Sequence, residues 1–353
     1  MRLDLSVDAV TLTEDLVNIE SVSGNEQAIA DAVESALSRL AHLEVQRFGN
    51  TIVARTHQGR AERVVIAGHL DTVPLNANLP ARRDEKSLHG LGTCDMKSGC
   101  AVALRIAATM PVTNRDLTFL FYDCEEVEAE RNGLFRLSRS NPALLAADFA
   151  ILMEPSDGVV EAGCQGTMRV DVLTRGERAH SARAWMGHNA IHGAADVLAR
   201  LNAYEPRRPV IDGLEYREGL NAVFITGGVA GNVLPDECRV SVNYRFAPDR
   251  SEEQALAHMR EVFAGFELEV SDSAPGALPG LAVPAAAAFI EAVGGTPNPK
   301  FGWTDVARFS SLGVPAVNFG PGNPILAHKQ EEFVPIEQII RVEAQLRDWL
   351  EVR

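Results

Sequence analysis

The chain has 353 residues, of which 46% are hydrophobic and 23% are charged. This composition is typical of a globular protein and excludes a disordered one, and the length suggests about two domains. The formal net charge of −15 argues against nucleic-acid partners, because the phosphate backbone is itself negative. The five cysteines are odd in number and show no CxxC spacing, so we expect neither a disulfide framework nor a structural zinc knuckle.

The first residues, MRLDLSVDAVTLTEDL, contain acids and lack the apolar core of a secretion signal. No run along the chain reaches the roughly 18 apolar residues that a membrane span requires. We therefore expect a cytoplasmic protein with no membrane partner.

An amphipathic helix is predicted near the start of the chain. Ser23 and Glu26 have the S-x-x-E spacing of a capping box, and apolar residues from Ile29 to Leu40 then recur at helical spacing. We expect a helix that these two residues cap and that buries one face.

Short apolar runs then alternate with helical patterns. Continuous apolar runs are typical of strands that are covered on both faces. Their alternation with helices predicts an α/β fold with a mostly parallel sheet flanked by helices. The predicted elements are strands RVVIAG (63–68), LTFLFY (117–122), FAILM (149–153) and PAVNFG (315–320), and helices at 99–109 and from about 285.

From about residue 167 the pattern changes. MRVDVLTRG and CRVSVNYRF alternate apolar and polar residues, as half-exposed antiparallel strands do. A helix-like stretch, NAIHGAADVLARL, lies between them, and Ser251 and Gln254 form a second capping-box spacing. We expect a separate α+β domain over 167–278, inserted into an α/β domain that is formed by 1–166 and 279–353.

Acids and histidines follow several of the predicted strands. Ligands of open α/β sheets bind beyond the carboxyl ends of the strands, so side chains that follow different strands can converge there. The glycine-punctuated loop GLGTCDMKSG, which opens a helix, adds Asp95. The others are His69 and Asp71 after the first strand, Glu125 and Glu126 after the second, Glu154 after the third, and His328 in the loop after the fourth.

Crowded carboxylates repel one another, so a bound cation is expected among them. Histidine and carboxylate ligands suit zinc or a similar first-row metal better than calcium or magnesium. If Asp95 bridges two ions, one takes His69 and Glu154 while the other takes Glu126 and His328. Two ions about 3.5 to 4 Å apart can acidify a shared water and polarise a substrate carbonyl.

Two acids remain for other roles. Glu125 is adjacent to an expected ligand but is not needed as one, so we expect it to be the general base. Asp71 lies two residues from His69 on an extended chain, and residues at that spacing share a face. Its carboxylate is therefore expected to hold the imidazole N–H of His69 and to fix the ring's tautomer.

These ordered motifs resemble the di-zinc amidohydrolases, a family that includes aminoacylase, acetylornithine deacetylase, glutamate carboxypeptidase and succinyl-diaminopimelate desuccinylase. The resemblance covers nearly the whole chain through SVSGNE, GHLDTVP, GTCDMKSG, CEEV, MEPS, RAHSARAWMGHNAI, GNVLPDECRVSVNYR, GWTDVARF and GPGNPILAHKQEE. It implies two zinc ions per subunit, for which cobalt or manganese could substitute. It implies metal ligands at His69, Asp95 (bridging), Glu126, Glu154 and His328, a catalytic glutamate at Glu125 and a supporting aspartate at Asp71.

The insert resembles the family's lid or dimerisation domain, with a ferredoxin-like pair of helices on a sheet. His180 matches a family histidine that reaches into the partner subunit's site and stabilises the developing oxyanion, a role that suits a preorganised donor. The resemblance therefore implies a homodimer that forms through the lid.

GWTDVARF is similar to the segment that binds the amino-acid carboxylate in succinyl-diaminopimelate desuccinylases, and ARAWMGHNAIH looks like the actinobacterial branch. The chain departs from many members at Arg183-Ala184, where they have a proline. Arginine forks match carboxylates bidentately, although structural ion pairs would explain the same arginines equally well. The expected substrate-binding residues are Arg245, Arg308, Asn232 and Thr304.

The resemblance implies a hydrolase that removes succinate from the small-molecule substrate N-succinyl-LL-2,6-diaminopimelate, in lysine and cell-wall precursor synthesis. An N-acetyl amino-acid deacylase or a metallo-carboxypeptidase would keep the mechanism and change the substrate. A non-catalytic metal or ligand binder is a further alternative, against which the intact Glu125 argues. Cys94 and Cys124 have no basic neighbour to form a thiolate, so we expect small core residues there.

Overall fold

The computed structural model describes residues 2–352, which form two compact units. Unit 1 contains the described residues up to Ala162, Gly280–Asn298 and the residues from Arg308 onwards. Unit 2 contains Gly163–Pro279 and Pro299–Ala307. Each unit has a hydrophobic core of its own.

Unit 1 is built around an eight-stranded sheet whose central strands β6, β3, β7 and β16 run parallel. Strands β1, β2 and β8 pair antiparallel at its flanks. The predicted α/β class is therefore confirmed. In sheet order the strands are β1 (Glu44–Phe48), β2 (Thr51–Arg55), β6 (Asp116–Tyr122), β3 (Arg63–His69), β7 (Phe149–Leu152), β16 (Ala316–Asn318), β8 (Glu161–Ala162) and β15 (Asn298–Pro299).

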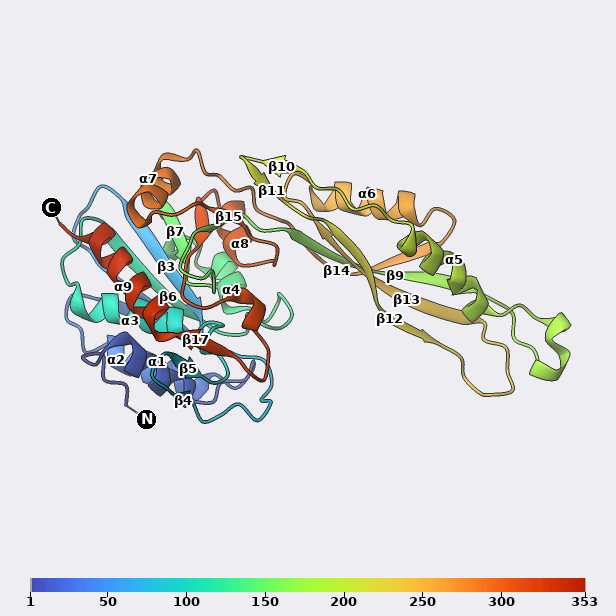
Figure 1. Ribbon diagram of the computed structural model, residues 1–353, viewed down its shortest axis with the longest axis horizontal. Coiled ribbons are helices and arrows are strands. Elements are labelled where there is room, and N and C mark those ends of the chain that lie inside the picture. The colour runs from blue at the N-terminus through green and yellow to red at the C-terminus, as the bar shows by residue number, and fades with distance from the viewer. Residues whose placement is uncertain (1, 353) are drawn as a thin grey trace. The chain divides into compact units, whose positions relative to one another are not determined.

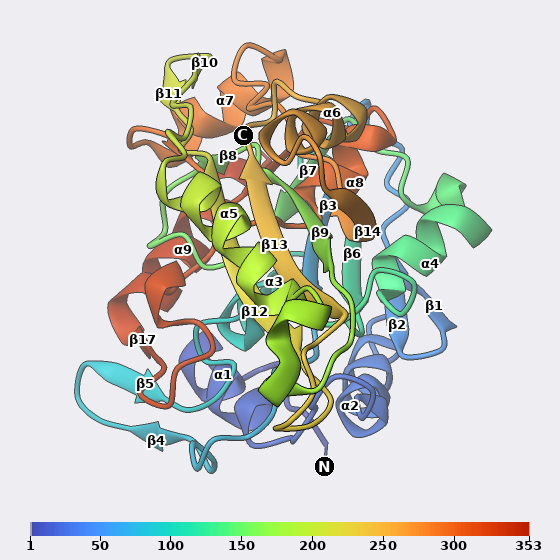
Figure 2. The same ribbon diagram turned by 90° about the vertical axis from the view of Figure 1, so that its right-hand side faces the viewer.

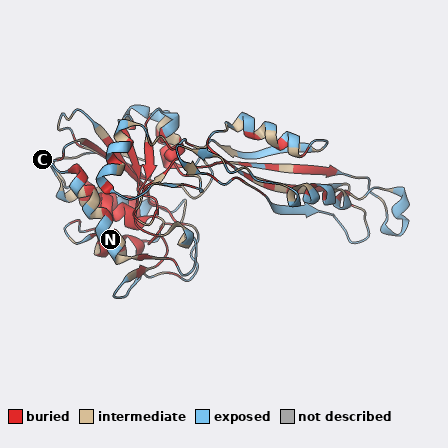
Figure 3. Cartoon of the chain, turned by 45° about the horizontal axis from the view of Figure 1, so that its top comes forward, coloured by how far each residue is buried: buried red, intermediate tan, exposed pale blue. Residues whose placement is uncertain are grey.

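The central strands are mostly apolar, as is typical of strands that helices cover on both faces. Every residue of β6 and β7 is buried, and the central strands of unit 1 appear red in Figure 3. Helices α1, α3 and α9 pack against one another over the sheet (Figure 1). The helices are α1 (Ala9–Val17), α2 (Gln27–Leu37), α3 (Lys97–Thr109), α4 (Gly133–Ser140), α7 (Pro284–Val293), α8 (Val306–Ser311) and α9 (Ile336–Leu350).

The predicted capping box at the start of α2 is wrong. The helix begins at Gln27, and its N-cap residue, Glu26, makes no side-chain capping bond. The Ser23 hydroxyl donates instead to Asp71, and Glu26 accepts from the Gly24 N–H. Both side chains are used in tertiary contacts near the ends of β3 and β6, which local spacing does not reveal.

Short elements connect the main ones. A three-stranded sheet pairs β17, β5 and β4 in that order, and β10 pairs with β11. These strands have only two or three residues each and carry no periodic signal in the sequence. They are β4 (Arg82–Arg83), β5 (Ser87–His89), β10 (Val210–Ile211), β11 (Leu214–Glu215) and β17 (Phe333–Pro335), with 3₁₀ turns η1 (Pro142–Leu144), η2 (Ser181–Met186) and η3 (Pro324–Leu326).

Unit 2 contains a four-stranded antiparallel sheet in the order β12, β13, β9, β14. Burial alternates along β9 and β13, as the sequence predicts for strands with one covered face. Helix α5 lies along β13 (Figure 2), and α6 begins with the predicted capping box of Ser251 and Gln254. The elements are β9 (Gly166–Arg175), α5 (Ala190–Asn202), β12 (Gly219–Gly227), β13 (Glu237–Phe246), α6 (Glu252–Val262) and β14 (Glu267–Ala274).

Among the residues that the structure describes, no helix is both long and apolar enough to cross a membrane.

Candidate metal centre

The candidate site lies where the parallel strands of unit 1 end. His69 is the last residue of β3 and pairs in register with Tyr122, the last residue of β6. The turn after β6 therefore begins beside His69. Glu154 follows β7, Asp95 precedes α3, Glu125 and Glu126 lie in the turn after β6, and His328 lies between η3 and β17.

Asp95 lies between two histidines. Its Oδ1 is 3.0 Å from His69 Nε2, and its Oδ2 is 3.4 Å from His328 Nε2. His328 Nε2 is also 2.8 Å from Glu126 Oε1. Asp95 thus belongs to two groups of neighbouring donor atoms, one with His69 and Glu154 and the other with Glu126 and His328.

The donor atoms fit a pair of first-row metal ions. Tetrahedral ligands about 2.0 to 2.1 Å from zinc are about 3.3 Å apart, close to the separations of the Asp95 oxygens from the two imidazoles. Nitrogen and carboxylate donors are also the ligand types that zinc, cobalt and manganese accept. That these five residues bind ions stays a prediction.

The electrostatics of the site favour a cation. Burial alone would lower the pKa of His69, but its bonds to Asp71 and Asp95 raise that pKa well above its usual value. Bonds to Asp95 and Glu126 likewise raise the pKa of His328 to about 10. Because a metal binds only neutral imidazole, metal ions and protons compete for these nitrogens. Acidic pH should therefore weaken metal binding.

Asp71 is the centre of a network of hydrogen bonds. Its Oδ1 accepts the backbone N–H of Glu125 at 3.0 Å, and its Oδ2 accepts the N–H of Glu126 at 3.1 Å and the Ser23 hydroxyl at 2.7 Å. The sequence predicts that the Asp71 carboxylate also holds His69. His69 Nδ1 lies 3.1 Å from the Asp71 carbonyl oxygen and 3.5 Å from the carboxylate Oδ1, and the orienting role of that carboxylate stays a prediction.

Glu125 lies close to the expected ligands. One of its carboxyl oxygens falls within 4.8 Å of ligand atoms of His69 and Glu126. Since its backbone N–H is held by Asp71, the residue starts from a fixed position in the turn. Its placement is consistent with proton transfer at the edge of the candidate metal centre.

Sequence reasoning missed two buried groups that support the Asp95 loop. Glu332, which is 1% exposed, accepts the backbone N–H groups of Cys94 and Asp95 at 2.8 and 3.1 Å. Lys97, also 1% exposed, donates from Nζ to the carbonyl of Ile19 at 2.8 Å. Burial raises the pKa of Glu332 to about 7 and lowers that of Lys97 to about 8. Glu332 lies in the AHKQEE motif together with His328, and this motif was the sequence feature that could have indicated a role for Glu332.

The remaining predicted residues belong to unit 2, except Arg308. In unit 2, His180 and Asn232 lie on neighbouring segments, because the Ser181 N–H donates to the Asn232 carbonyl at 2.9 Å. The hydroxyl oxygen of Thr304, which is buried in the same unit, has no hydrogen-bond partner among the described residues. Arg245 lies on β13, and in unit 1 the guanidinium of Arg308 lies 4.6 Å from the Phe135 ring centroid. Their part in substrate binding stays a prediction.

Comparison with known proteins agrees with this geometry. The model of the peptidase family M20/M25/M40 matches residues 65–351, which is most of the chain. The chain belongs to the M20/M25/M40 peptidase family. The matched range contains all five candidate ligands, Asp71 and Glu125.

Two curated members of the M20/M25/M40 family match this chain over almost all of both sequences. A protein of Mycobacterium tuberculosis named succinyl-diaminopimelate desuccinylase DapE is 53% identical over 351 residues, covering 99% of each chain. The succinyl-diaminopimelate desuccinylase of Corynebacterium glutamicum is 48% identical, covering 99% of this chain and 97% of its own. Among solved structures, a Staphylococcus aureus tripeptidase has a TM-score of 0.79 at 22% identity, covering 99% and 98% of the chains, which shows a shared fold.

Proposed function

We propose that this protein is a metal-dependent amidohydrolase that converts N-succinyl-LL-2,6-diaminopimelate and water into succinate and LL-2,6-diaminopimelate. The observation that carries the proposal is the placement of Asp95 between His69 and His328, in a chain with full-length identity to proteins named for this reaction. The reaction belongs to diaminopimelate and lysine synthesis.

In the proposed mechanism, His69, Asp95, Glu126, Glu154 and His328 would hold two zinc ions, which when bound would acidify water and polarise the scissile carbonyl. Glu125 takes a proton from the attacking water and delivers it to the leaving amine nitrogen. The amide C–N bond breaks, the carbonyl carbon gains the water oxygen, and the products are a carboxylate and an amine.

Several residues are proposed to hold the substrate's three carboxylates. Asp272 acts electrostatically on the guanidinium of Arg245, and the guanidinium fork could pair bidentately with a substrate carboxylate. The buried hydroxyl of Thr304 and the amide of Asn232 could add hydrogen bonds, and Arg308 could add a second guanidinium. His180 is proposed to stabilise the oxyanion in the site of a second copy of the chain.

The test is metal-dependent turnover on competing substrates. Protein stripped with a chelator and reloaded with zinc should bind two equivalents and release succinate from N-succinyl-LL-diaminopimelate. Its kcat/KM on this compound should exceed that on N-acetylornithine and on dipeptides by at least about tenfold, since lost carboxylate contacts weaken transition-state binding. Preference for acetylornithine or dipeptides would assign a different substrate. Absence of both metal and turnover would favour a non-catalytic binder.

A further inference from the structure

Three consecutive backbone N–H groups in the turn after β6 each donate to a carboxyl group from another segment. The N–H groups of Glu125 and Glu126 donate to Asp71, as described above. The N–H of Cys124 donates to Oε1 of Glu26 at 3.2 Å. The proposed mechanism uses Glu125 and Glu126 but gives no role to Glu26.

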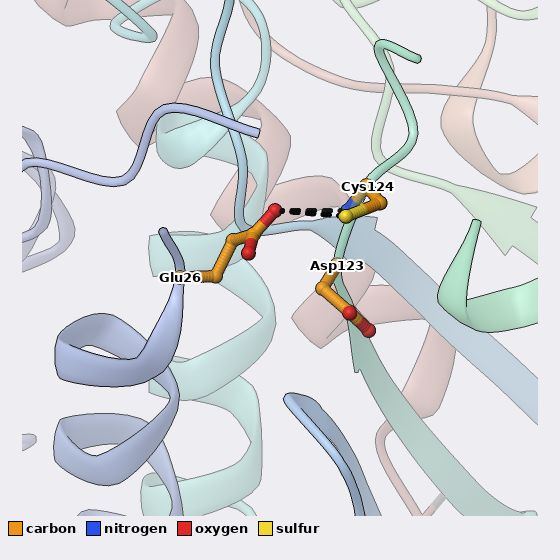
Figure 4. A group of neighbouring side chains, drawn as sticks. All are labelled: Glu26, Asp123 and Cys124. Atoms are coloured by element: carbon orange, nitrogen blue, oxygen red, sulfur yellow. Dashed lines mark hydrogen bonds between the residues drawn. The ribbon is translucent and has the colours of Figure 1, made fainter. Parts of the chain in front are cut away.

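Glu26 reaches this turn from the beginning of α2 (Figure 4). The side chain is buried, with the residue 1% exposed. Its Oε1 accepts from the Gly24 N–H at 2.7 Å and from the Cys124 Sγ at 3.2 Å in addition to the Cys124 N–H. One oxygen atom therefore joins the segment before α2 to the residue that precedes Glu125.

Cys124 needs such support because its backbone has a φ of +57°. A residue with a side chain is disfavoured in this left-handed region, because its Cβ comes too close to the backbone. This conformation sets the direction of the chain into Glu125 and Glu126. The bond from the Cys124 N–H to Glu26 opposes relaxation of the turn to a more favourable backbone conformation.

The neighbouring acid does not turn this cluster into a third metal site. One donor atom each from Glu26, Asp123 and Cys124 lie within 4.8 Å of one another. The Asp123 carboxyl group points away from Glu26 in Figure 4, and its oxygens accept from Thr51 and Arg136. Asp123 is thus paired with other side chains, and Glu26 is left facing the backbone of Cys124.

We propose that Glu26 is a positioning residue, which holds the turn at Cys124 so that Glu125 and Glu126 face the metal centre. Its effect on turnover rests on the proposed function, while its effect on the turn does not. Loss of Glu26 should therefore lower kcat more than it raises KM, because substrate-binding groups are untouched.

Hydrogen exchange and kinetics test this inference together. In Glu26→Ala, peptides that cover residues 120–130 should exchange at least about tenfold faster than in the wild type, because local opening exposes these amides. With excess zinc present, kcat should fall on the order of 10- to 100-fold, with KM changed less than about threefold, as 1 Å misplacements of catalytic groups can cost that much. Glu26→Gln keeps an acceptor oxygen and should restore both readouts to within about threefold of wild type.

Asp116→Ala is the matched control. Asp116 is also buried and accepts two backbone N–H groups, but it lies at the opposite end of β6. The Asp116→Ala variant should lower thermal stability without changing kcat or hydrogen exchange over residues 120–130.

Unchanged hydrogen exchange in folded Glu26→Ala, or the same changes in Asp116→Ala, would overturn the inference. If Glu26→Ala does not fold, Glu26→Asp, which is one methylene too short to reach Cys124, should show the same losses. A wild type that is inactive on the succinyl substrate would reject the proposed function, and exchange would still decide the role of Glu26.

Discussion

At the scale of single residues, hydrogen bonds from backbone N–H groups to buried carboxyl groups help to position the candidate site. Buried carboxyl groups that accept backbone N–H groups hold two of the segments that carry proposed ligands. Asp71 holds the turn with Glu126, and Glu332 holds the loop with Asp95. Such bonds to charged groups contribute more than neutral ones, on the order of 1.5 to 3 kcal/mol each. The backbone at Glu126 and Asp95 is thus held by bonds that need neither an ion nor a substrate.

Replacing the proposed base should separate chemistry from metal binding. Glu125→Gln keeps the size of the side chain and its N–H bond to Asp71 but cannot accept a proton. We expect kcat to fall on the order of 10²- to 10⁴-fold, the usual contribution of general base catalysis. Zinc content, measured by atomic absorption, should stay at the wild-type value. Glu128→Gln, at an exposed position three residues further on, is the control and should keep wild-type kcat. Equal turnover in both variants would remove Glu125 from the mechanism.

The sequence predicted where the acids and histidines converge, because most of them follow a strand of a parallel sheet and parallel strands share one edge, while Asp95 precedes a helix. It did not predict which buried carboxyl groups hold the loops. The S-x-x-E spacing of Ser23 and Glu26 was interpreted as a helix cap, yet both side chains turn to β3 and β6. Choosing between these partners requires knowledge of which segments are adjacent in space.

At the scale of elements, strands were predictable in proportion to their length and burial. Strands β3 and β6 are continuous apolar runs and match the sequence prediction to within one residue at each end. The two-residue strands β4 and β8 form through pairing with neighbours and carry no pattern. Packing also depends on contacts that sequence does not show: a Cβ at Gly99 in α3 would lie 2.2 Å from the Met153 carbonyl oxygen. The glycine therefore lets α3 approach the strand end that carries Glu154.

Asp116, at the beginning of β6, should make stability depend on pH. Burial alone would raise its pKa, but the N–H groups of Gln58 and Arg60 and the Thr56 hydroxyl lower it overall. A lowered folded-state pKa contributes stability above the unfolded value of about 3.9 and loses it as pH falls through the folded value.

Asp116→Asn should therefore reduce the free energy of unfolding by about 2 kcal/mol at pH 7, the worth of bonds to a charged acceptor. The difference from wild type should begin to shrink below about pH 4, where the unfolded wild-type chain takes up a proton at Asp116, and should vanish as pH falls through the lowered folded-state pKa. Urea unfolding of both proteins at pH 7 and at pH 3.5 measures it. A difference that is the same at both pH values would show that charge at Asp116 does not matter.

At the scale of the whole molecule, the chain forms two units with separate cores, and it leaves unit 1 and returns to it twice. Membership of the M20/M25/M40 family could be expected from the sequence because its motifs are spread along nearly the full length. Assembly could not be derived from residue patterns alone, because the exposure of a strand edge depends on the order of strands in the sheet. In unit 2 that order leaves β12 at an edge.

The edge strand β12 supports the proposed homodimer. Val223, Phe224 and Ile225 are consecutive on β12 and are 45%, 66% and 52% exposed, and Ile191 and Leu198 on α5 are 42% and 39% exposed. An apolar edge strand with free hydrogen-bonding groups favours pairing with another chain, and a second copy related by twofold symmetry would present the same edge. We therefore expect a dimer in solution that covers these side chains.

Phe224→Lys should weaken this dimer, because it places a charge among apolar side chains that the partner would cover. Loss of a central aromatic contact costs at least about 2 kcal/mol, and the added charge increases that cost, so the dissociation constant should rise by about 100-fold or more. Light scattering during gel filtration over a range of concentrations would measure it. Val112→Lys, at an apolar residue of unit 1 that is 61% exposed, should leave the dimer intact. If His180 acts in the partner's site, Phe224→Lys should also lose turnover as it dissociates, and a fully active monomer would exclude that role.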